Sequence, residues 1–242
     1  MRNTIMIVGA LSLLAAGCSK KEEAKPEAKM EAKTEVKPEA KTEAPKVATP
    51  DPAAAKPADP APAAGAKKLY LDVHELGPGK VTAKDVAGAH AKDLATQGKY
   101  GVEYKAYWVD EKEGKIYCLA EAPSAEAAST VHKEAHGLVA SKVMEVTADN
   151  ADWKPTPGMK LFMDVHHMGP GKVTAEDVAG AHKKDLAAQD KHKVKYINYW
   201  FDKDSGTIMC LSEAPSADAA LAVHKEAHGL VPESIELVAE GR

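Results

Sequence analysis

Apolar and polar positions alternate along two blocks of the chain in a way that predicts both strands and helices. Leu69, Leu71 and Val73 alternate with polar or aromatic residues, which is the period of a β-strand. Thr82 precedes a helical stretch and can cap it, and Gly137 follows another one and can end it. The predicted elements are a strand at 69–74, a helix at 83–97, strands at 102–109 and 115–122 joined by a hairpin, a helix at 124–136 and a strand at 142–146. This order, βαββαβ, is that of the ferredoxin-like fold.

The second block repeats the first at a constant offset of 92 residues and without a gap. Of the 78 positions from Leu69 to Val146, 49 carry the same residue in the second block. Identity at this level indicates a tandem duplication of one domain. We therefore expect an α+β protein with ferredoxin-like repeats at 67–146 and 159–238, joined by a polar linker at 147–158.

Each repeat is expected to have one uncovered sheet face, because its two helices cover only the other. The uncovered face is expected to carry Tyr70, Tyr107, Tyr117 and Leu119. The two repeats can then cover each other as a pseudo-dimer within one chain. Cys118 and Cys210 are expected to face the helices as free thiols, since a disulfide needs Cα atoms within about 7 Å.

Residues 1–18 are typical of a targeting signal. Arg2 precedes twelve almost wholly apolar residues at 5–16, and Gly17 and Cys18 follow. The apolar run is too short to span a bilayer and fits a signal peptide. Its ending, LLAAGC, resembles the lipobox of bacterial lipoproteins, which implies acylation of Cys18 and a lipid anchor in the cell envelope. In a Gram-negative cell, Ser19 indicates the periplasmic face of the outer membrane.

The segment 19–66 consists almost entirely of Lys, Glu, Ala, Pro and Thr and has no aromatic residue. Such a segment cannot bury enough apolar surface to offset its chain entropy. We therefore predict a disordered tether between the anchor and the repeats.

The charge balance argues against nucleic-acid binding. The chain carries 32 basic and 36 acidic side chains, for a net charge of −4, and its only arginines are Arg2 and Arg242. Nucleic-acid binders usually have a basic excess and use arginine forks. The predicted partners are therefore the membrane, through Cys18, and the other repeat of the same chain, with no nucleic acid.

Eight of the ten histidines occupy four equivalent positions in the two repeats. His132 and His136 lie four apart on one helix face, so two imidazoles there can chelate one divalent ion. His90 lies on the sheet-facing stripe of the first helix and can approach His132, with Asp93 one turn away. The predicted metal ligands are His90, His132 and His136, with His182, His224 and His228 in the second repeat, and with His74 and His166 as second choices. Without a metal, His90 is interpreted as a hydrogen-bonded boundary residue and His136 as a helix C-terminal residue.

A second candidate site lies on the sheet face that we expect to be uncovered. Alternation places four polar or aromatic side chains of each repeat on that face, namely Asp72, His74, Tyr107 and Glu121, with Asp164, His166, Tyr199 and Glu213. If the two sheets pack together, these residues line an enclosed space that can hold a metal or a small ligand, or can form a polar interface. The sequence indicates no catalytic residue, no organic cofactor and no particular reaction.

The motifs together resemble a known protein family. LYLDVH, VTAKDVAGAH, YWVDEKEGKIYCLAEAPSAEAA and VHKEAHGLV are similar to segments of small bacterial ferredoxin-like proteins of otherwise unknown function, whose described type is a nickel-binding protein that dimerises. The resemblance covers both repeats. It implies a fused dimer within one chain, nickel as the metal ion, and nickel sequestration or buffering as the role.

Three functional hypotheses follow from the sequence. The first is a lipid-anchored envelope protein that binds a divalent metal. The second is a small-ligand binder or an enzyme built as an α+β barrel around the inter-sheet space. The third is an interaction module without a site of its own.

Overall fold

The computed structural model describes residues 66–150 and 153–242. These residues fall within one compact unit, Pro57–Arg242. The predicted signal peptide, Cys18 and nearly all of the predicted tether lie outside the described residues. Among the described helices, none is long and apolar enough to cross a membrane.

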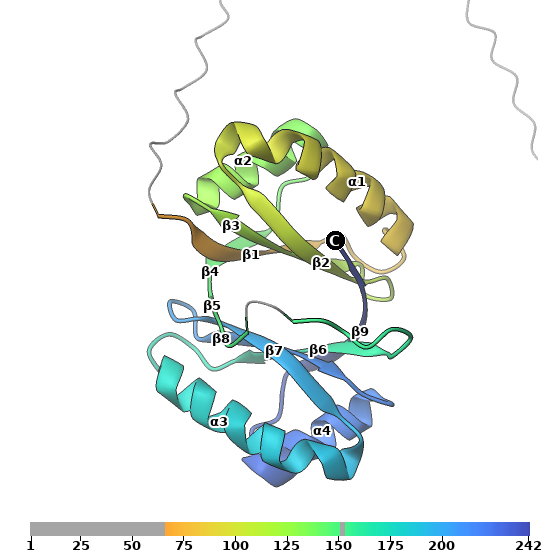
Figure 1. The fold of residues 1–242 in the computed structure, drawn as a ribbon, viewed down its shortest axis with the longest axis vertical. Helices are drawn as coiled ribbons and strands as arrows, with labels where there is room; N and C mark the ends of the chain where they lie inside the picture. The colour runs from red at the N-terminus through yellow and green to blue at the C-terminus, as the bar shows by residue number, and fades with distance from the viewer. Residues whose placement is uncertain (1–65, 151–152) are drawn as a thin grey trace, which may run out of the picture. The chain divides into compact units, whose positions relative to one another are not determined.

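Each repeat folds as two helices on one face of an antiparallel sheet (Figure 1). Repeat 1 contains β1 (Lys68–Glu75), α1 (Ala83–Thr96), the 3-10 turn η1 (Gln97–Tyr100), β2 (Glu103–Asp110), β3 (Lys115–Ala122), α2 (Ala125–Ala135) and β4 (Lys142–Glu145), and the connection to repeat 2 begins with β5 (Thr147–Ala148). Repeat 2 contains β6 (Leu161–His167), α3 (Ala175–Ala188), η2 (Gln189–His192), β7 (Lys195–Asp202), β8 (Thr207–Glu213), α4 (Ala217–Ala227) and β9 (Ser234–Gly241). The predicted α+β class and the tandem ferredoxin-like repeats are confirmed.

The helix ends follow from local sequence. Thr82 and Asp85 form a reciprocal capping box at the start of α1, and Ser124 caps α2 by accepting the N–H of Ala127. Gly137, with φ of 81°, ends the helical path after His136 in a conformation that favours glycine. These caps set where each helix begins and ends, and the buried residues Val86, His90 and Asp93 of α1 mark the face that meets the sheet.

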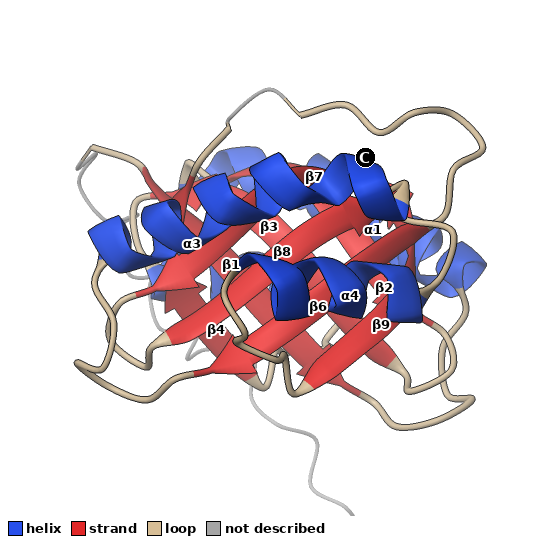
Figure 2. Ribbon diagram, turned by 90° about the horizontal axis from the view of Figure 1, so that it is seen from below, coloured by secondary structure: helices blue, strands red, loops and turns tan. Residues whose placement is uncertain are grey.

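The strands of both repeats form one sheet in the order β4-β1-β3-β2-β9-β6-β8-β7-β5. The last strand of repeat 2 joins the two halves, because β9 pairs first with β6 and then, at its end, with β2 of repeat 1. In the same way, the chain that leaves β4 continues into β5, which pairs with β7 of repeat 2. Only Val146 separates β4 from β5, so the strand order closes on itself as a barrel with the helices outside (Figure 2).

Apolar side chains fill the interior of this barrel. One core of fifteen buried residues lies there, from the strands of both repeats and from the connection between them, namely Leu71, Ala106, Trp108, Tyr117, Leu119, Met144, Val146, Trp153, Leu161, Met163, Val165, Trp200, Met209, Leu211 and Val238. In each repeat, a separate core lies between the strands and the two helices that cover them. Since all three cores are built from residues of the compact unit, this unit has what it needs to fold by itself.

The predicted faces of the strands are partly wrong. Tyr117 and Leu119 face the barrel interior as expected, but Tyr70 and Tyr107 lie in the core beneath the helices. On β1 both stripes are largely buried, so alternation alone could not decide which stripe meets the helices. On β2 the register shifts between Tyr104 and Ala106, and this bulge changes the face on which the following residues lie.

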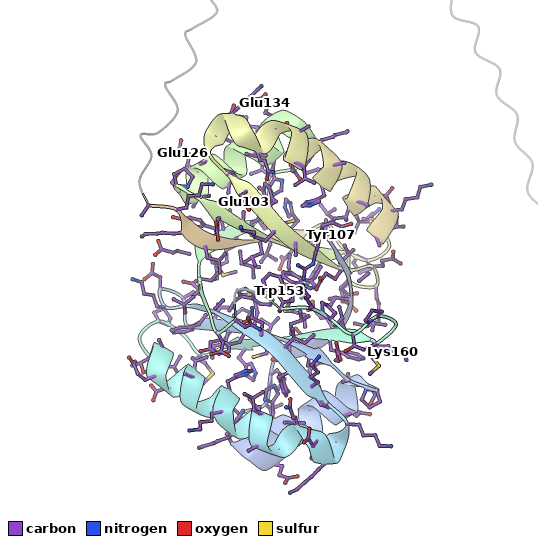
Figure 3. The ribbon with its side chains drawn as sticks, in the orientation of Figure 1. Glu103, Tyr107, Glu126, Glu134, Trp153 and Lys160 are labelled. Atoms are coloured by element: carbon purple, nitrogen blue, oxygen red, sulfur yellow. The ribbon has the colours of Figure 1, made fainter. Side chains whose placement is uncertain are left out.

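The segment predicted as a plain linker contributes to the fold. It contains β5, and Trp153 is only 5% exposed and packs against Trp108 and Trp200 between the two sheets (Figure 3). Trp108 and Trp153 both donate their indole N–H to Glu240. The connection between the repeats is therefore part of the barrel core.

Candidate metal centre

A polar cluster lies between the sheet and the helices of each repeat, on the opposite side of the sheet from the barrel core. In repeat 1, β1 supplies Asp72 and His74, α1 supplies Asp93, and α2 supplies His132. His136 follows directly at the end of α2. Alternation on β1 places Asp72 and His74 on the helix side, so their predicted position on the uncovered face is wrong.

The inner group of the cluster consists of Asp72, His74, Cys118 and His132, all of them buried. Asp72 and Cys118 are directly opposite each other on paired strands. Nε2 of His132 lies 3.0 Å from Oδ2 of Asp72, and it is also 3.0 Å from Oη of Tyr104. Nε2 of His74 lies 3.3 Å from the other carboxylate oxygen of Asp72, Oδ1, which makes no hydrogen bond within the described residues. One donor atom from each member of the group lies within 4.8 Å of the others.

The outer group consists of Asp93, His132 and His136. Nδ1 of His132 lies 3.0 Å from Oδ1 of Asp93, and Nε2 of His136 lies 3.1 Å from the same oxygen. The backbone N–H of Leu138 donates to Nδ1 of His136 at 3.2 Å. His132 therefore belongs to both groups and bridges two buried carboxylates.

Repeat 2 reproduces this cluster with nearly the same distances. Nε2 of His224 lies 3.2 Å from Asp164 Oδ2, and its Nδ1 lies 3.1 Å from Asp185 Oδ1. His166 lies 3.3 Å from Asp164, and His228 lies 3.1 Å from Asp185. The two groups there are Asp164, His166 and His224, and Asp185, His224 and His228.

The two carboxylates determine the charge of the bridging histidine. Burial alone would lower the pKa of His132, but hydrogen bonds to Asp72 and Asp93 and their negative charges raise it to about 9. The same balance raises the pKa of His224 to about 9. Burial acts against the ionised form of Asp72, yet its contacts with His132 and His74 lower its pKa. Without a metal, the bridging histidine is thus a cation at neutral pH and donates a proton to each carboxylate.

The tautomer of His136 distinguishes the two groups as metal ligands. Burial lowers the pKa of His136, so its ring is neutral at pH 7. Because Nδ1 accepts the N–H of Leu138, the ring proton lies on Nε2 and points to Asp93. Nε2 of His136 then has no lone pair for a metal in this arrangement. In the inner group, a metal would displace only the Nε2 proton of the His132 cation, and the neutral ring that remains would still donate its Nδ1–H to Asp93.

A cavity of about 30 Å³ reaches this cluster in repeat 2. Its lining includes all four duplicated histidines of the repeat, together with Asp185 and Cys210: His166, His182, His224 and His228. This is about the share of volume that one water molecule has in the liquid, so the cavity is large enough for a single ion or water molecule.

His90 and His182 lie beside the cluster, in neither group of donor atoms within the described residues. His90 is 4% exposed and packs against the rings of Tyr104 and Tyr107. Neither of its nitrogens has a hydrogen-bond partner in the described part of the chain, and burial lowers its pKa. The structure therefore brings His132 and His136 together as predicted. The ring of Tyr104 contacts both His90 and His132, so His90 is a neighbour of the cluster and not a member of it.

The remaining residues of the predicted inter-sheet pocket are dispersed. Tyr107 lies in the core beneath the helices of repeat 1. Glu121 forms an ion pair with Lys105 near the surface, and Glu213 accepts the backbone N–H of Thr156. The space that they were expected to line is occupied by the barrel core. Cys118 and Cys210 are free, buried thiols beneath the helices, as predicted.

Sequence reasoning placed Asp93 near the histidines of α1 and α2 but assigned Asp72, and Asp164 in repeat 2, to the other face of the sheet. Asp72 and Asp93, with their counterparts Asp164 and Asp185, are duplicated as faithfully as the histidines. For Asp72 and Asp164, the signal is the DVH motif, which puts an acid and a histidine two apart and thus on one side of a strand.

The fold and site define a class: two-repeat α+β barrels that carry a buried histidine–carboxylate cluster under the helices of each half. A sequence model described as "Nickel responsive protein SCO4226-like" matches residues 70–146 and 162–238, and this chain belongs to that SCO4226-like family. Family membership and the histidine–aspartate groups together support the binding of a metal ion.

Several solved structures are similar to the chain over part of its length. The crystal structure of SCO4226 from Streptomyces coelicolor A3(2) is 39% identical, with 32% of this chain and 93% of that chain covered and a TM-score of 0.30. A putative monooxygenase from Lactobacillus acidophilus NCFM is 8% identical, with coverages of 72% and 93% and a TM-score of 0.40. A haem-binding protein from Thermus thermophilus is 10% identical, with coverages of 75% and 92% and a TM-score of 0.37. No curated protein sequence matches the chain.

Proposed function

We propose that this protein is a lipid-anchored protein of the bacterial cell envelope that binds a divalent metal, nickel above all, and sequesters or buffers it. The observation that carries the proposal is the convergence of duplicated histidines and buried carboxylates on one cluster in each repeat. The family is described as nickel responsive, and imidazole ligands suit nickel.

The inner group is the better ligand set. We assign the metal to Nε2 of His132, with Asp72 and His74 as further ligands and Cys118 beside them. Oδ1 of Asp72 supports this choice, because it is buried, makes no hydrogen bond among the described residues and lies 3.3 Å from Nε2 of His74, which is assigned to the same ion. Asp93 then holds the Nδ1–H of His132, which orients the ring in the way that a carboxylate behind a metal-bound histidine commonly does.

Calorimetric titration of residues 57–242 with Ni²⁺, Zn²⁺ and Cu²⁺ at pH 7 tests the metal function. We expect saturable uptake of two equivalents of Ni²⁺ per chain, with Ni²⁺ bound more tightly than Zn²⁺. The double variant His74→Gln and His166→Gln should lose this uptake. The matched control, His167→Gln and His192→Gln, removes the same number of imidazoles outside the clusters and should keep it.

The outcomes separate the parts of the proposal. Weak, non-saturating heat from the unchanged protein would contradict metal binding as the function. Equal loss of uptake in both double variants would mean surface binding by scattered imidazoles. Tighter binding of Zn²⁺ than of Ni²⁺ would contradict nickel as the ion.

The lipid anchor has its own test. The full chain, expressed in a bacterium that processes lipoproteins, should incorporate labelled palmitate and enter the detergent phase on Triton X-114 separation. Cys18→Ser should abolish both properties, whereas Ser19→Ala should retain the label. A full chain that takes up no palmitate and stays in the aqueous phase would contradict the lipid anchor. The metal proposal would be unaffected.

A further inference from the structure

One difference between the surroundings of the two metal clusters arises from the exchange of strand ends between the repeats. The chain that leaves β5 passes over repeat 2, and the end of β9 passes over repeat 1. By the constant offset of 92 residues, Asp149 and Gly241 are equivalent positions in these two crossing segments.

Asp149 lies next to a buried histidine of the opposite repeat. Its Oδ2 is 3.8 Å from Nε2 of His182, whose side chain is 7% exposed, while the Asp149 side chain is 51% exposed. Nδ1 of His182 is buried and has no hydrogen-bond partner among the described residues, and His182 lines the cavity at the cluster. A carboxylate beside Nε2 favours the tautomer with its proton on Nε2, which leaves the buried Nδ1 with a lone pair.

Within the described ranges, repeat 1 has no such contact. Gly241 pairs with Tyr107 on β2, and a Cβ atom at position 241 would lie only 2.0 Å from Cζ of Tyr107. No side chain therefore fits there without displacing the Tyr107 ring. His90, the counterpart of His182, has no described partner at either nitrogen.

We propose that the two metal sites are unequal, and that repeat 2 binds the divalent cation more tightly because Asp149 orients His182 and adds negative charge beside the cavity. Asp149 is a positioning residue supplied by the connection out of repeat 1. This inference rests on the proposed metal binding. Since Asp149 is half exposed, its charge is partly screened, and we expect an effect of about tenfold in Kd.

Nickel titration of residues 57–242 tests the inference through Asp149→Asn. The unchanged protein should show two classes of site, with one equivalent each and Kd values about tenfold apart. In Asp149→Asn the tighter class should weaken to the affinity of the other, and the weaker class should stay unchanged. Asp149→Glu should restore two classes. Asp190→Asn, an exposed substitution in the same repeat with the same charge change, should leave both classes as they are.

Assignment to repeat 2 uses backgrounds with one site removed. With Asp72→Asn, which disables site 1, Asp149→Asn should weaken the remaining equivalent about tenfold. With Asp164→Asn, which disables site 2, Asp149→Asn should change nothing. If a background variant fails to fold, the comparison within the otherwise unchanged chain still decides, because Asp149 is exposed.

The possible failures are distinguishable. Two equal sites, or two classes unaffected by Asp149→Asn, would overturn the inequality and leave metal binding intact. Absence of any saturable uptake would overturn the proposed function, and the inference with it. An equal weakening of both classes would show a general charge effect and would also overturn the role of Asp149.

Discussion

The two faces of each sheet bury different kinds of side chain. The face toward the barrel interior buries Trp108, Trp200 and aliphatic residues, whereas the face toward the helices buries Asp72, His74 and their partners together with apolar neighbours. Buried charges cost free energy unless they are paired, and they seldom improve on an apolar core. The difference indicates that the apolar interior holds the two repeats together and that the candidate metal ligands lie on the helix side.

The largest expected effect concerns the barrel interior. Trp200 is fully buried, so Trp200→Ala should lower the free energy of unfolding by about 3–5 kcal/mol through lost burial and the cavity left behind. Urea unfolding measures the loss. Protein that remains folded should still take up the same number of nickel equivalents. Loss of metal by a folded Trp200→Ala variant would break the separation of the two faces.

Stability between pH 5 and 10 should depend strongly on the buried histidines of the helix side. The pKa of His132 is about 9 against an ordinary 6.5, so its stabilisation is complete below pH 6.5 and is lost as the pH rises through 9. The loss is on the order of 3 kcal/mol, and His224 adds a similar one. On the acid side, the lowered pKa of His90 removes stability as the pH falls below 6.5. Urea unfolding of metal-free protein from pH 5 to 10 measures both limbs, and a flat alkaline limb would contradict the bridging cation.

Neighbouring residues on β1 allow the two faces to be compared directly. Asp72→Asn removes a ligand charge and should weaken one nickel equivalent by about a hundredfold, so that one site remains in a calorimetric titration. Leu71→Val changes the interior face instead and should cost about 1 kcal/mol of stability without altering nickel uptake. If the two variants had the same effect on uptake, the metal would not be on the helix side.

The smallest expected effect separates the inner group from the outer group. Asp93→Asn should weaken nickel binding about tenfold but preserve the stoichiometry, because Asp93 supports His132 without binding the metal. Calorimetry measures the Kd. Loss of a whole equivalent on Asp93→Asn, with Asp72→Asn nearly silent, would instead place the metal in the outer group.

Much of the fold could be predicted from the sequence, because the signals were local. Thr82 and Ser124 cap helices where the pattern indicated, and the constant offset of 92 residues revealed the duplication. The faces of β1 and β2 could not be predicted: one strand is buried on both sides and the other contains a bulge at Tyr104. The exchange of strand ends depends on contacts between the repeats, which alternation within one strand does not report.

The candidate site was predicted in part. The spacing of His132 and His136 correctly indicated a shared helix face, since that follows from helix geometry alone. The roles of Asp72 and His74 depend on which sheet face the helices cover, so an error in the face moved both residues away from the cluster. Trp153 was missed because a single aromatic residue in a polar, proline-containing segment gives no periodic signal.

The most direct test of the account is the position of the metal itself. Crystals of residues 57–242 grown with one to two equivalents of Ni²⁺ can be measured on both sides of the nickel absorption edge. We predict two anomalous peaks per chain, each about 2 Å from Nε2 of the bridging histidine, His132 or His224, and within coordination distance of Asp72 or Asp164. Anomalous peaks confined to exposed side chains, with none beneath the helices, would contradict the account.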